Sequence, residues 1–547
     1  MKFKSEQTEQ KLRGGYYTPL NVAMFLSKFA IDSKTRSVLE PSCGDGVFLK
    51  AIAAVKPSIE ISAVEIESEA AKKSKKLGQM LNLNLSLTRG DFLDESLQIN
   101  KIKYDAVVGN PPYIRYQFLE GDTQKRASRI FDLASLTFTR HTNLWVTFVI
   151  AAVQRLNDSG RIAMIIPSEI LNVIHPGQLR KYLLSECSDI LIIDSQELVF
   201  SDALQGTVLL LAQKKNSSGF QERSNLAIRY ERNLEFLKKS PMAMFKKADY
   251  APTLVSEKKW MLPLLTADER ELIARVTAMP AVKRFAEIAK IEVGMVTGAN
   301  DFFLVSDETI ETYSLNKYVQ PMVGRSQHLK GVIYTKDKHA KNKELNLPVN
   351  FIDFPSLPQK SLTKNLRNYI NIGELADLHL RYKTRIREPW YVVPSKWAPQ
   401  LFLLKRSYTV PRLIVNELGA FNTDTAYRVT TELDPISFAY SFYNSLTAIS
   451  TELEGRSYGG GVLELVPSEV RRLVIPLITA TREQIEKLDS AIENRVSTNE
   501  LLAIQDNIVL KQIGLSASEI SKIQNARIKL QSRRFRVNEP LADCENE

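Results

Sequence analysis

Residues 38–48 read Val38-Leu39-Glu40-Pro41-Ser42-Cys43-Gly44-Asp45-Gly46-Val47-Phe48, which is an apolar strand, a Gly-x-Gly turn and the start of a helix. Glycines at such a turn let the backbone approach a ligand at the carboxyl end of the first strand of an open α/β sheet. The spacing differs from the G-x-G-x-x-G and P-loop patterns that bind phosphates, so a ligand without a pyrophosphate is implied. An ordinary strand–turn–helix junction uses the same residues, and the neighbouring segments must decide between the two interpretations.

Short apolar runs alternate with helical stretches from Ser37 to Gln213. The runs that we expect to be strands are Ser37–Leu39, Ile59–Glu65, Leu85–Thr88, Tyr104–Gly109, Arg161–Pro167, Ile190–Ser195 and Thr207–Gln213. This alternation predicts a doubly wound α/β sheet with helices on both faces. Between the helix Leu144–Leu156 and the strand at Arg161, the residues Asn157-Asp158-Ser159-Gly160 predict a turn.

Acidic residues lie at the ends of the second and third expected strands. Glu65 follows the glycine turn by about 20 residues, where a carboxylate can accept both ribose hydroxyls of an adenosyl group. Asp91, in Gly90-Asp91-Phe92, follows the next strand and could accept a hydrogen bond from the amino group of adenine. Each acid alone could be a solvated strand end. Acids in register after successive strands make a chance arrangement much less plausible.

A buried strand leads into Asn110-Pro111-Pro112-Tyr113. The two prolines fix φ and remove two N–H donors, which leaves backbone carbonyls that can accept hydrogen bonds. Together with the side-chain oxygen of Asn110, they can take both hydrogens of an exocyclic amine and aim its nitrogen lone pair at an electrophilic methyl group. Such chemistry depends on positioning and electrostatic preorganisation. Tyr113 offers a flat face to a planar base. The alternative is an ordinary Pro-Pro turn after a strand.

These motifs and their order resemble the gamma-class (TaqI-like) DNA adenine-N6 methyltransferases of restriction–modification systems. The resemblance covers roughly residues 14–215 and implies a Rossmann-like class I methyltransferase sheet that binds S-adenosylmethionine. Asn110, Pro111, Pro112 and Tyr113 then form the catalytic loop, and the Asn favours adenine over cytosine. The residues that match the family's cofactor contacts are Thr18, Glu40, Gly44, Gly46, Glu65, Asp91 and Asn110. Phe200 matches the aromatic residue that packs on the extruded adenine opposite Tyr113, while the first motif lacks the aromatic residue that many members carry.

The remainder of the chain is expected to hold the DNA. We expect a methyltransferase domain at 14–245, an α+β DNA target-recognition domain at 250–480 and a helical segment at 481–540, with a linker at 238–259. Extruding a base costs a few kcal/mol, which contacts elsewhere on the duplex must offset. The expected DNA contacts are Arg381, Lys383, Arg385 and Arg387, which are interleaved with the aromatic residues Tyr382, Trp390, Tyr391 and Trp397. Arg456, before a glycine run, is a further expected contact. The basic helix end 527–536 is expected to make non-specific phosphate contacts. The alternative for the whole basic and aromatic segment 380–406 is a solvated face with core aromatics.

Charge and composition fit this assignment. A net charge of +11 suits a polyanionic partner, here double-stranded DNA. The N-terminus has no apolar signal core, and no apolar run approaches the roughly 20 residues of a membrane span, so we expect a cytoplasmic protein without membrane contact. Three widely separated cysteines support neither a disulfide framework nor a zinc site, and no metal site is expected.

Two other functions fit parts of the sequence. A methyltransferase acting on RNA adenine or on protein glutamine can carry Asn-Pro-Pro-Tyr, but such enzymes are usually much shorter. A non-catalytic DNA-recognition subunit could retain the fold, although the complete set of cofactor residues argues against decay. A separate restriction endonuclease or defence-system subunit would be a natural partner for the methyltransferase.

Overall fold

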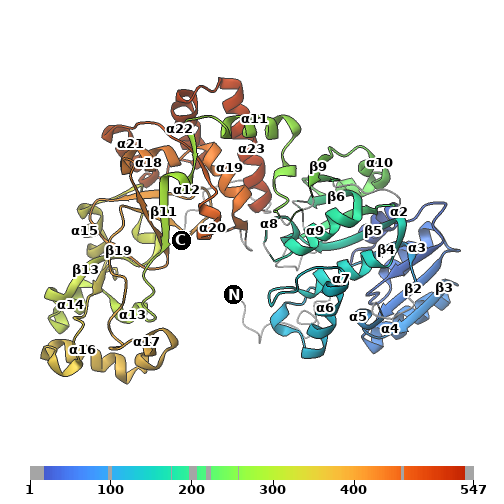
Figure 1. Cartoon of the computed structure of the whole chain (residues 1–547), viewed down its shortest axis with the longest axis horizontal. Coiled ribbons are helices and arrows are strands. Elements are labelled where there is room, and N and C mark those ends of the chain that lie inside the picture. Colours follow the sequence, from blue (N-terminus) through green and yellow to red (C-terminus); the bar gives the residue numbers. More distant parts are fainter. Residues whose placement is uncertain are drawn as a thin grey trace. The chain divides into compact units, whose positions relative to one another are not determined.

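The computed structural model describes residues 18–95, 102–173, 175–195, 197, 206–216, 223–254, 256, 258–457 and 461–535. The chain forms two compact units (Figure 1). The first ends at Ala267, and the second extends from Asp268 to Arg534.

One twisted sheet organises the described part of the first unit, with strand order β3-β2-β1-β4-β5-β7-β6-β8-β9. The strands β1 to β5 pair in parallel with one another, whereas β7 runs antiparallel between β5 and β6. The bounds are β1 (Ser37–Glu40), β2 (Glu60–Glu65), β3 (Asn84–Arg89), β4 (Tyr104–Gly109), β5 (Leu156–Pro167), β6 (Cys187–Ser195), β7 (Thr207–Lys214), β8 (Arg223–Glu231) and β9 (Ala251–Leu254). The doubly wound sheet predicted from the sequence is confirmed, and all seven expected strands are present.

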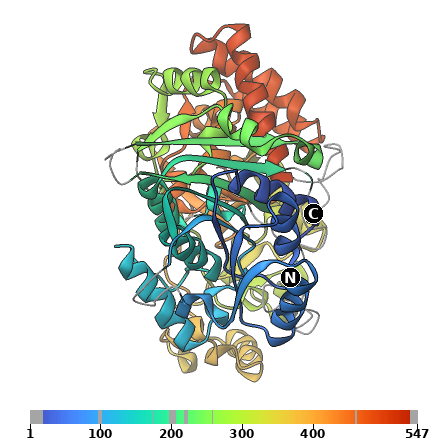
Figure 2. The same ribbon diagram turned by 90° about the vertical axis from the view of Figure 1, so that its right-hand side faces the viewer.

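Helices cover both faces of this sheet (Figures 1 and 2). On one face, α2 (Leu20–Ala30), α3 (Val47–Val55) and α10 (Pro241–Lys246) share an apolar core with alternate residues of the central strands. The other alternate residues point to the opposite face, where α7 (Leu144–Gln154) and α9 (Gly177–Glu186) contact β5 and β6. Every residue of α7 except Gln154 is buried, which explains its almost continuous apolar sequence.

Two expectations about irregular segments were wrong. The residues 157–160 lie inside β5, where the pairing with β4 jumps from Leu156 to Arg161 and Ser159 has a φ of +61°, so the expected turn is a bulge within the strand. The expected linker 238–259 contains α10 and the edge strand β9. Phe245 of α10 packs on Phe29 with ring centroids 4.8 Å apart, which fastens this segment to the sheet's own core.

The second unit has the predicted α+β character (Figure 1, green to red). A five-stranded sheet has the order β11-β20-β16-β18-β14, and a four-stranded sheet has the order β12-β15-β13-β19. The strand bounds are β11 (Ala289–Val293), β12 (Leu304–Val305), β13 (Val319–Val323), β14 (Ile333–Tyr334), β15 (Asn350–Ile352), β16 (Leu401–Leu404), β18 (Leu413–Asn416), β19 (Phe421–Asn422) and β20 (Ala426–Thr431). The unit ends in α21 (Arg482–Glu493), α22 (Thr498–Gln512) and α23 (Ala517–Phe535). A capping box formed by Thr481 and Gln484 begins α21, as the sequence predicts.

The basic end of α23 was expected to contact phosphates, and this expectation was wrong. Arg534 is buried and donates to the carboxylate of Glu452 at 2.8–3.1 Å. Arg527 is also buried, with its guanidinium on Asn499 (2.8 Å) and Gln531 (2.6 Å). These arginines hold the C-terminal helix in the unit and do not present their charge to a ligand.

Two buried histidines make the stability of the second unit depend on pH. His328 accepts a hydrogen bond from the Gly324 amide (3.2 Å), and His339 is hydrogen-bonded to the Tyr334 hydroxyl (2.9 Å). Burial, aided by nearby cations, lowers the pKa of each imidazole to about 4.

We therefore expect the free energy of unfolding to fall as the pH falls from about 6.5, the ordinary histidine pKa, towards 4, because only the unfolded chain takes up these protons. Urea titrations between pH 7 and pH 4.5 measure this. The variant His328→Asn should lose less stability over this window than the wild type, and His141→Asn, at an exposed position, should behave like the wild type. Equal losses in all three proteins would contradict the assignment.

Candidate active site

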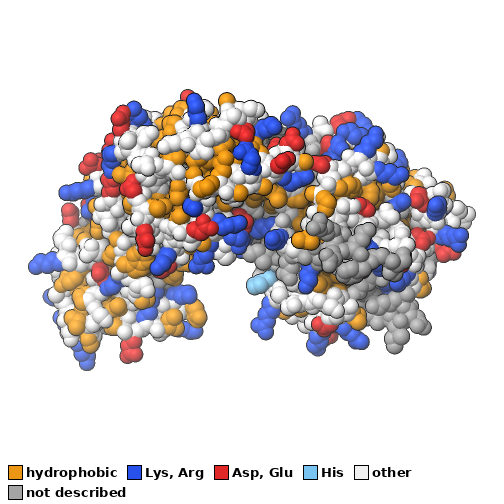
Figure 3. Space-filling model, turned by 45° about the horizontal axis from the view of Figure 1, so that its top comes forward, with side chains coloured by type: hydrophobic (Ala, Val, Ile, Leu, Met, Phe, Trp, Pro, Cys, Tyr) orange, Lys and Arg blue, Asp and Glu red, His pale blue; other side chains and the backbone are white. Residues whose placement is uncertain are grey.

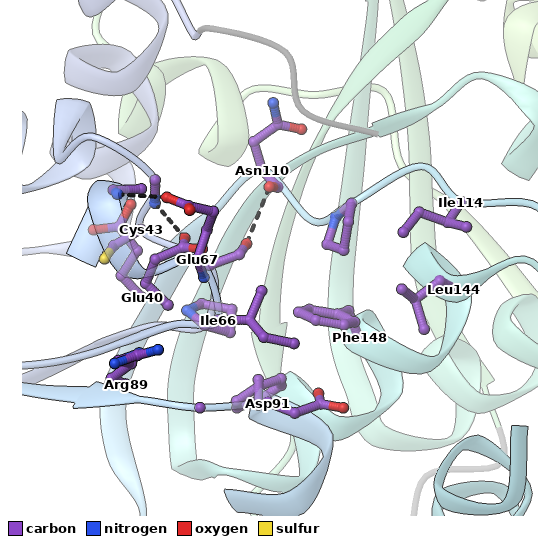
Figure 4. Close-up of a pocket in the computed structure, with 18 of the residues that line it drawn as sticks. Glu40, Cys43, Ile66, Glu67, Arg89, Asp91, Asn110, Ile114, Leu144 and Phe148 are labelled. Atoms are coloured by element: carbon purple, nitrogen blue, oxygen red, sulfur yellow. Dashed lines mark hydrogen bonds between the residues drawn. The ribbon is translucent and has the colours of Figure 1, made fainter. Parts of the chain in front are cut away.

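A cavity of about 1020 Å³ opens where the parallel strands of the first unit end (Figure 4). Its lining includes residues at the ends of β1, β2 and β3, residues of the loop that follows β4, and Thr18 just before α2. Six of the seven expected cofactor residues belong to it: Thr18, Glu40, Gly44, Glu65, Asp91 and Asn110. The parallel register is what brings these residues together, because every strand delivers its carboxyl end to the same edge.

The turn after β1 depends on two glycines with positive φ, +54° at Gly44 and +88° at Gly46. The amide of Gly44 faces the cavity and donates to Glu65 (2.8 Å). Gly46 is not among the lining residues. A Cβ atom there would come within 2.7 Å of the Leu77 side chain, so Gly46 allows the turn to pack on α4 (Ser68–Met80).

Glu65 ends β2 and is nearly buried. Its two carboxylate oxygens accept the amides of Gly44 and Glu67, each at 2.8 Å. These bonds fix the plane of the carboxylate and leave each oxygen a further lone pair. The arrangement can accept two neighbouring hydroxyl groups of a sugar.

Glu40 is the most unusual acid of the cavity. It is fully buried, and neither carboxylate oxygen has a hydrogen-bond partner among the described residues. Burial, together with the charges of Glu65 and Asp45, raises the pKa of Glu40 well above its ordinary value. A buried carboxylate without a partner is unfavourable, so the geometry calls for a cationic or hydrogen-donating ligand.

The charge of the whole lining favours the same kind of ligand. Its acids are Glu40, Asp45, Glu65, Glu67, Glu69, Asp91 and Glu120, and its bases are Lys73 and Arg89. With seven acids against two bases, the cavity disfavours a phosphorylated nucleotide and suits a nucleoside that carries positive charge. The ammonium and sulfonium groups of S-adenosylmethionine fit this requirement.

The far end of the cavity is apolar and was missed by sequence reasoning. Figure 4 shows Ile114, Leu144 and Phe148 on the side opposite Glu40 and Glu67. Ile66 also lines it and is 68% exposed, which is unusual for a residue that directly follows a buried strand. These side chains supply apolar surface for a flat ring, in place of the aromatic residue absent from the first motif. Ile66 could have been noticed beside Glu65, but Phe148 lies on α7 and no local signal points to it.

Asp91 lies at this end and is held by a residue that the sequence did not indicate. One oxygen accepts the Leu93 amide (2.9 Å), and the other pairs with the guanidinium of Arg126 at 3.0 Å. Arg126 belongs to α6 (Gly121–Leu133) and also pairs with Asp94 at 2.5 Å. The ion pairs therefore fix both α6 and the carboxylate of Asp91 at the cavity.

The Asn110 loop is fastened at several points. The Asn110 amide donates to the Thr18 hydroxyl (3.3 Å), and its main-chain carbonyl accepts the Ser42 hydroxyl (3.1 Å). Figure 4 shows the Asn110 amide directed away from Glu40 and Glu67. Tyr113 is half-buried and donates its hydroxyl to the Ile165 carbonyl of β5 at 3.0 Å. Of the two prolines, Pro112 lines the cavity, whereas Pro111 is buried and is not among the lining residues.

The expected aromatic partner of Tyr113, Phe200, lies outside the described residues, as do residues 14–17 and 458–460. Among the described residues, no group of His, Cys, Asp and Glu is arranged to hold a metal ion. No helix in the described ranges is long and apolar enough to cross a membrane.

The expected DNA contacts all lie in the second unit, but they differ in accessibility. Arg381, Lys383 and Arg385 are exposed. The guanidinium of Arg387 donates to the carbonyls of Val296 (2.6 Å) and Thr297 (2.7 Å).

The guanidinium of Arg456 is held by the buried Glu469 at 3.0 Å. Of the interleaved aromatics, Trp390 and Tyr391 belong to an apolar core cluster, and Trp397 lies against Arg428. Of these four aromatic residues only Tyr382 is exposed (65%), so only its ring is accessible to a ligand.

Comparison with known proteins covers almost the whole chain. Residues 3–256 match the N-6 DNA Methylase family, and residues 257–510 match the C-terminal domain of the Type II methyltransferase M.Eco57I. The chain is 25% identical to the Type II methyltransferase M.AccI of Acinetobacter calcoaceticus and 21% identical to M.XamI of Xanthomonas campestris pv. amaranthicola. The alignment with M.AccI covers 84% of this chain and 84% of M.AccI, and the alignment with M.XamI covers 85% of each.

A solved structure has a similar fold. The Type IIL restriction–modification enzyme MmeI, determined in complex with DNA, covers 93% of this chain and 73% of its own, with a TM-score of 0.51 and 11% identity. With a DNA methylase family matched over residues 3–256 and a methyltransferase C-terminal domain matched over residues 257–510, the chain is an S-adenosylmethionine-dependent adenine-N6 DNA methyltransferase of the restriction–modification type.

Proposed function

We propose that the enzyme methylates one specific adenine after that base has rotated out of the duplex, and that Asn110 positions its amino group. The observation that carries this proposal is the position of Asn110, which lines the acidic cavity and donates to Thr18 at its edge. A residue there can contact a target base and a bound methyl donor together.

The side-chain oxygen of Asn110 and the Pro111 carbonyl would each accept one hydrogen of the adenine N6 amine. This withdraws the nitrogen lone pair from the ring and directs it at the methyl group. S-adenosylmethionine, when bound, supplies that methyl group on a sulfonium. Because the Ser42 and Thr18 contacts fix the Asn110 loop in advance, little reorganisation is needed when the base arrives.

The lining residues suggest an orientation for the cofactor. Glu40 would face its cationic methionine end, and Glu65 would accept the ribose hydroxyls. Asp91 would accept from the adenine amino group, with Ile66 and Phe148 against the ring. Each assignment rests on the charge, hydrogen-bonding capacity or apolar surface of that side chain in the cavity.

We assign DNA recognition to the second unit, with Arg381, Lys383 and Arg385 as phosphate contacts because they are exposed. Arg387 and Arg456 are left out of this set, since their guanidinium groups bind carbonyls and Glu469. A separate restriction endonuclease or defence subunit is the partner that this activity implies. The cytoplasm, where bacterial DNA lies, is the expected place of action.

The first test concerns the target amine. Asn110→Ala should remove nearly all methyl transfer while S-adenosylmethionine still binds, because Asn110 acts mainly on the base. Single-turnover transfer to duplex DNA and calorimetric cofactor binding measure the two effects separately. A variant that keeps a tenth or more of the wild-type rate would contradict the role of Asn110.

The second test concerns Glu40. Because its pKa is raised in the folded protein, the cofactor-free enzyme should lose stability as the pH rises from the ordinary glutamate pKa of about 4.3. Glu40→Gln should therefore raise the Tm at pH 8 and flatten this dependence. It should also weaken cofactor binding by on the order of 10-fold, the size of a lost hydrogen bond to a charged group.

Glu69→Gln is the matched control for Glu40, because Glu69 lines the same cavity but is exposed and paired with Lys72. It should change neither the melting profile nor the cofactor affinity appreciably. Calorimetry that shows unchanged binding by Glu40→Gln would place the cationic end of the cofactor elsewhere.

The third test concerns Arg126 and Asp91. If Arg126 orients Asp91 towards the cofactor adenine, Arg126→Gln should reduce the preference for S-adenosylhomocysteine over its inosine analogue, which lacks the amino group. The dissociation constants of both compounds measure this ratio. Lys125→Gln, on the solvent-exposed neighbour that pairs with Asp122, should leave the ratio at its wild-type value. An unchanged ratio in Arg126→Gln would rule out this positioning role.

A further inference from the structure

An exposed apolar cluster lies among the cations of the second unit. It comprises Leu380, Tyr382 and Ile386, which are 59%, 65% and 66% exposed. They lie at the end of a 3₁₀ turn (Leu378–Leu380) and along α17 (Tyr382–Arg385). Figure 3 shows hydrophobic side chains interspersed with basic and some acidic ones at the end of this unit that bears α16 (Lys364–Leu375) and α17. Grouped exposed side chains of this size indicate a binding surface.

The charge around the cluster selects the kind of partner. Residues 380–387 read Leu-Arg-Tyr-Lys-Thr-Arg-Ile-Arg, with four cations and no acid. Three of these cations, Arg381, Lys383 and Arg385, are exposed beside the apolar side chains. A surface that combines apolar groups with a run of exposed cations is complementary to a nucleic acid, whose bases are apolar on their faces and whose phosphates are anionic.

The cluster is rigidly mounted. Thr384, on the opposite side of α17, is fully buried, and its hydroxyl donates to the Leu378 and Arg381 carbonyls, the latter at 3.0 Å. Gly298, with a φ of +82°, lets this helix approach closely, since a Cβ atom at this glycine would lie 2.9 Å from that of Lys383. Arg387 ties the end of the segment to the same turn through the Val296 and Thr297 carbonyls.

Tyr382 is oriented by its neighbours. The Lys383 ammonium lies 5.3 Å from the centroid of its ring, and the Arg385 guanidinium lies 5.7 Å from it. Both are cation–π distances. The exposed aromatic ring is thus contacted by two cations, and little conformational entropy is lost when it is buried against a partner.

We propose that Leu380, Tyr382 and Ile386 form a wedge that inserts between base pairs of the duplex and bends it, while Arg381, Lys383 and Arg385 contact the flanking phosphates. The inference rests on duplex DNA being the substrate of this enzyme. Apolar side chains that enter a base step unstack it and kink the helix, and the cost is lowest at flexible pyrimidine–purine steps. The wedge would therefore add sequence preference at positions that no side chain reads by hydrogen bonding.

The test uses the full chain and a duplex that carries its methylation site, with a dye at each end to report bending by energy transfer. Leu380→Ala/Tyr382→Ala/Ile386→Ala should reduce affinity by on the order of 10-fold, the effect of losing base stacking, and should lose the bend. The slope of affinity against salt should stay unchanged. Arg381→Gln, which leaves both cations beside the Tyr382 ring in place, should keep the bend and lower that slope by up to about one unit, the effect of one lost phosphate contact.

Leu375→Ala is the control, because Leu375 is 88% exposed on the neighbouring α16 (Lys364–Leu375) outside the cationic run. It should bind and bend DNA like the wild type. A triple apolar variant that binds and bends DNA normally would overturn the wedge, as would one that changes only self-association or binding to another protein. If the wild-type chain itself neither binds nor methylates duplex DNA, the proposed function fails instead.

Discussion

Parallel pairing of β3, β2, β1 and β4 is the constraint on which the site depends. The register sets Glu40 beside Ala63, Glu65 beside Arg89 and Leu39 beside Val107, so four strands end at one edge of the sheet. Residues spread over about 70 positions of sequence, from the turn after β1 to the loop after β4, meet there as a consequence. No single segment contains the cavity, and a change in register of any of these strands would separate its acids.

The protein has two surfaces of opposite charge, which suit two ligands of opposite charge. The cavity is lined by seven acids and two bases, and its Glu40 is fully buried. A buried carboxylate without a partner lowers the stability of the fold until a cation binds beside it. The exposed segment 380–387 of the other unit carries only positive charge. A cationic methyl donor and a polyanionic duplex therefore each find a complementary surface, and each is disfavoured at the other's site.

Local sequence signals were sufficient to predict the sheet and the residues at the ends of its strands. They were not sufficient to predict the cavity residues that distant helices contribute. Strand periodicity and turn glycines predicted β1 to β7 and placed Glu65, Asp91 and Asn110 correctly at strand ends. Arg126 and Phe148 were missed because their role depends on how α6 and α7 pack. Composition also could not distinguish a free arginine from a paired one: Arg381 is exposed, whereas Arg456 binds Glu469 and Arg534 binds Glu452. The polar, irregular pattern of residues 238–259 suggested a linker, but this segment contains α10 and β9, the edge strand of the sheet.

The most direct measurement is mass spectrometry of nucleosides from duplex DNA incubated with the purified chain and S-adenosylmethionine that carries a deuterated methyl group. Labelled N6-methyldeoxyadenosine is the expected product, confined to one sequence context when the same DNA is sequenced with detection of modified bases. Labelled N4-methyldeoxycytidine, or no labelled nucleoside despite bound cofactor, would contradict adenine methylation through the Asn110 loop.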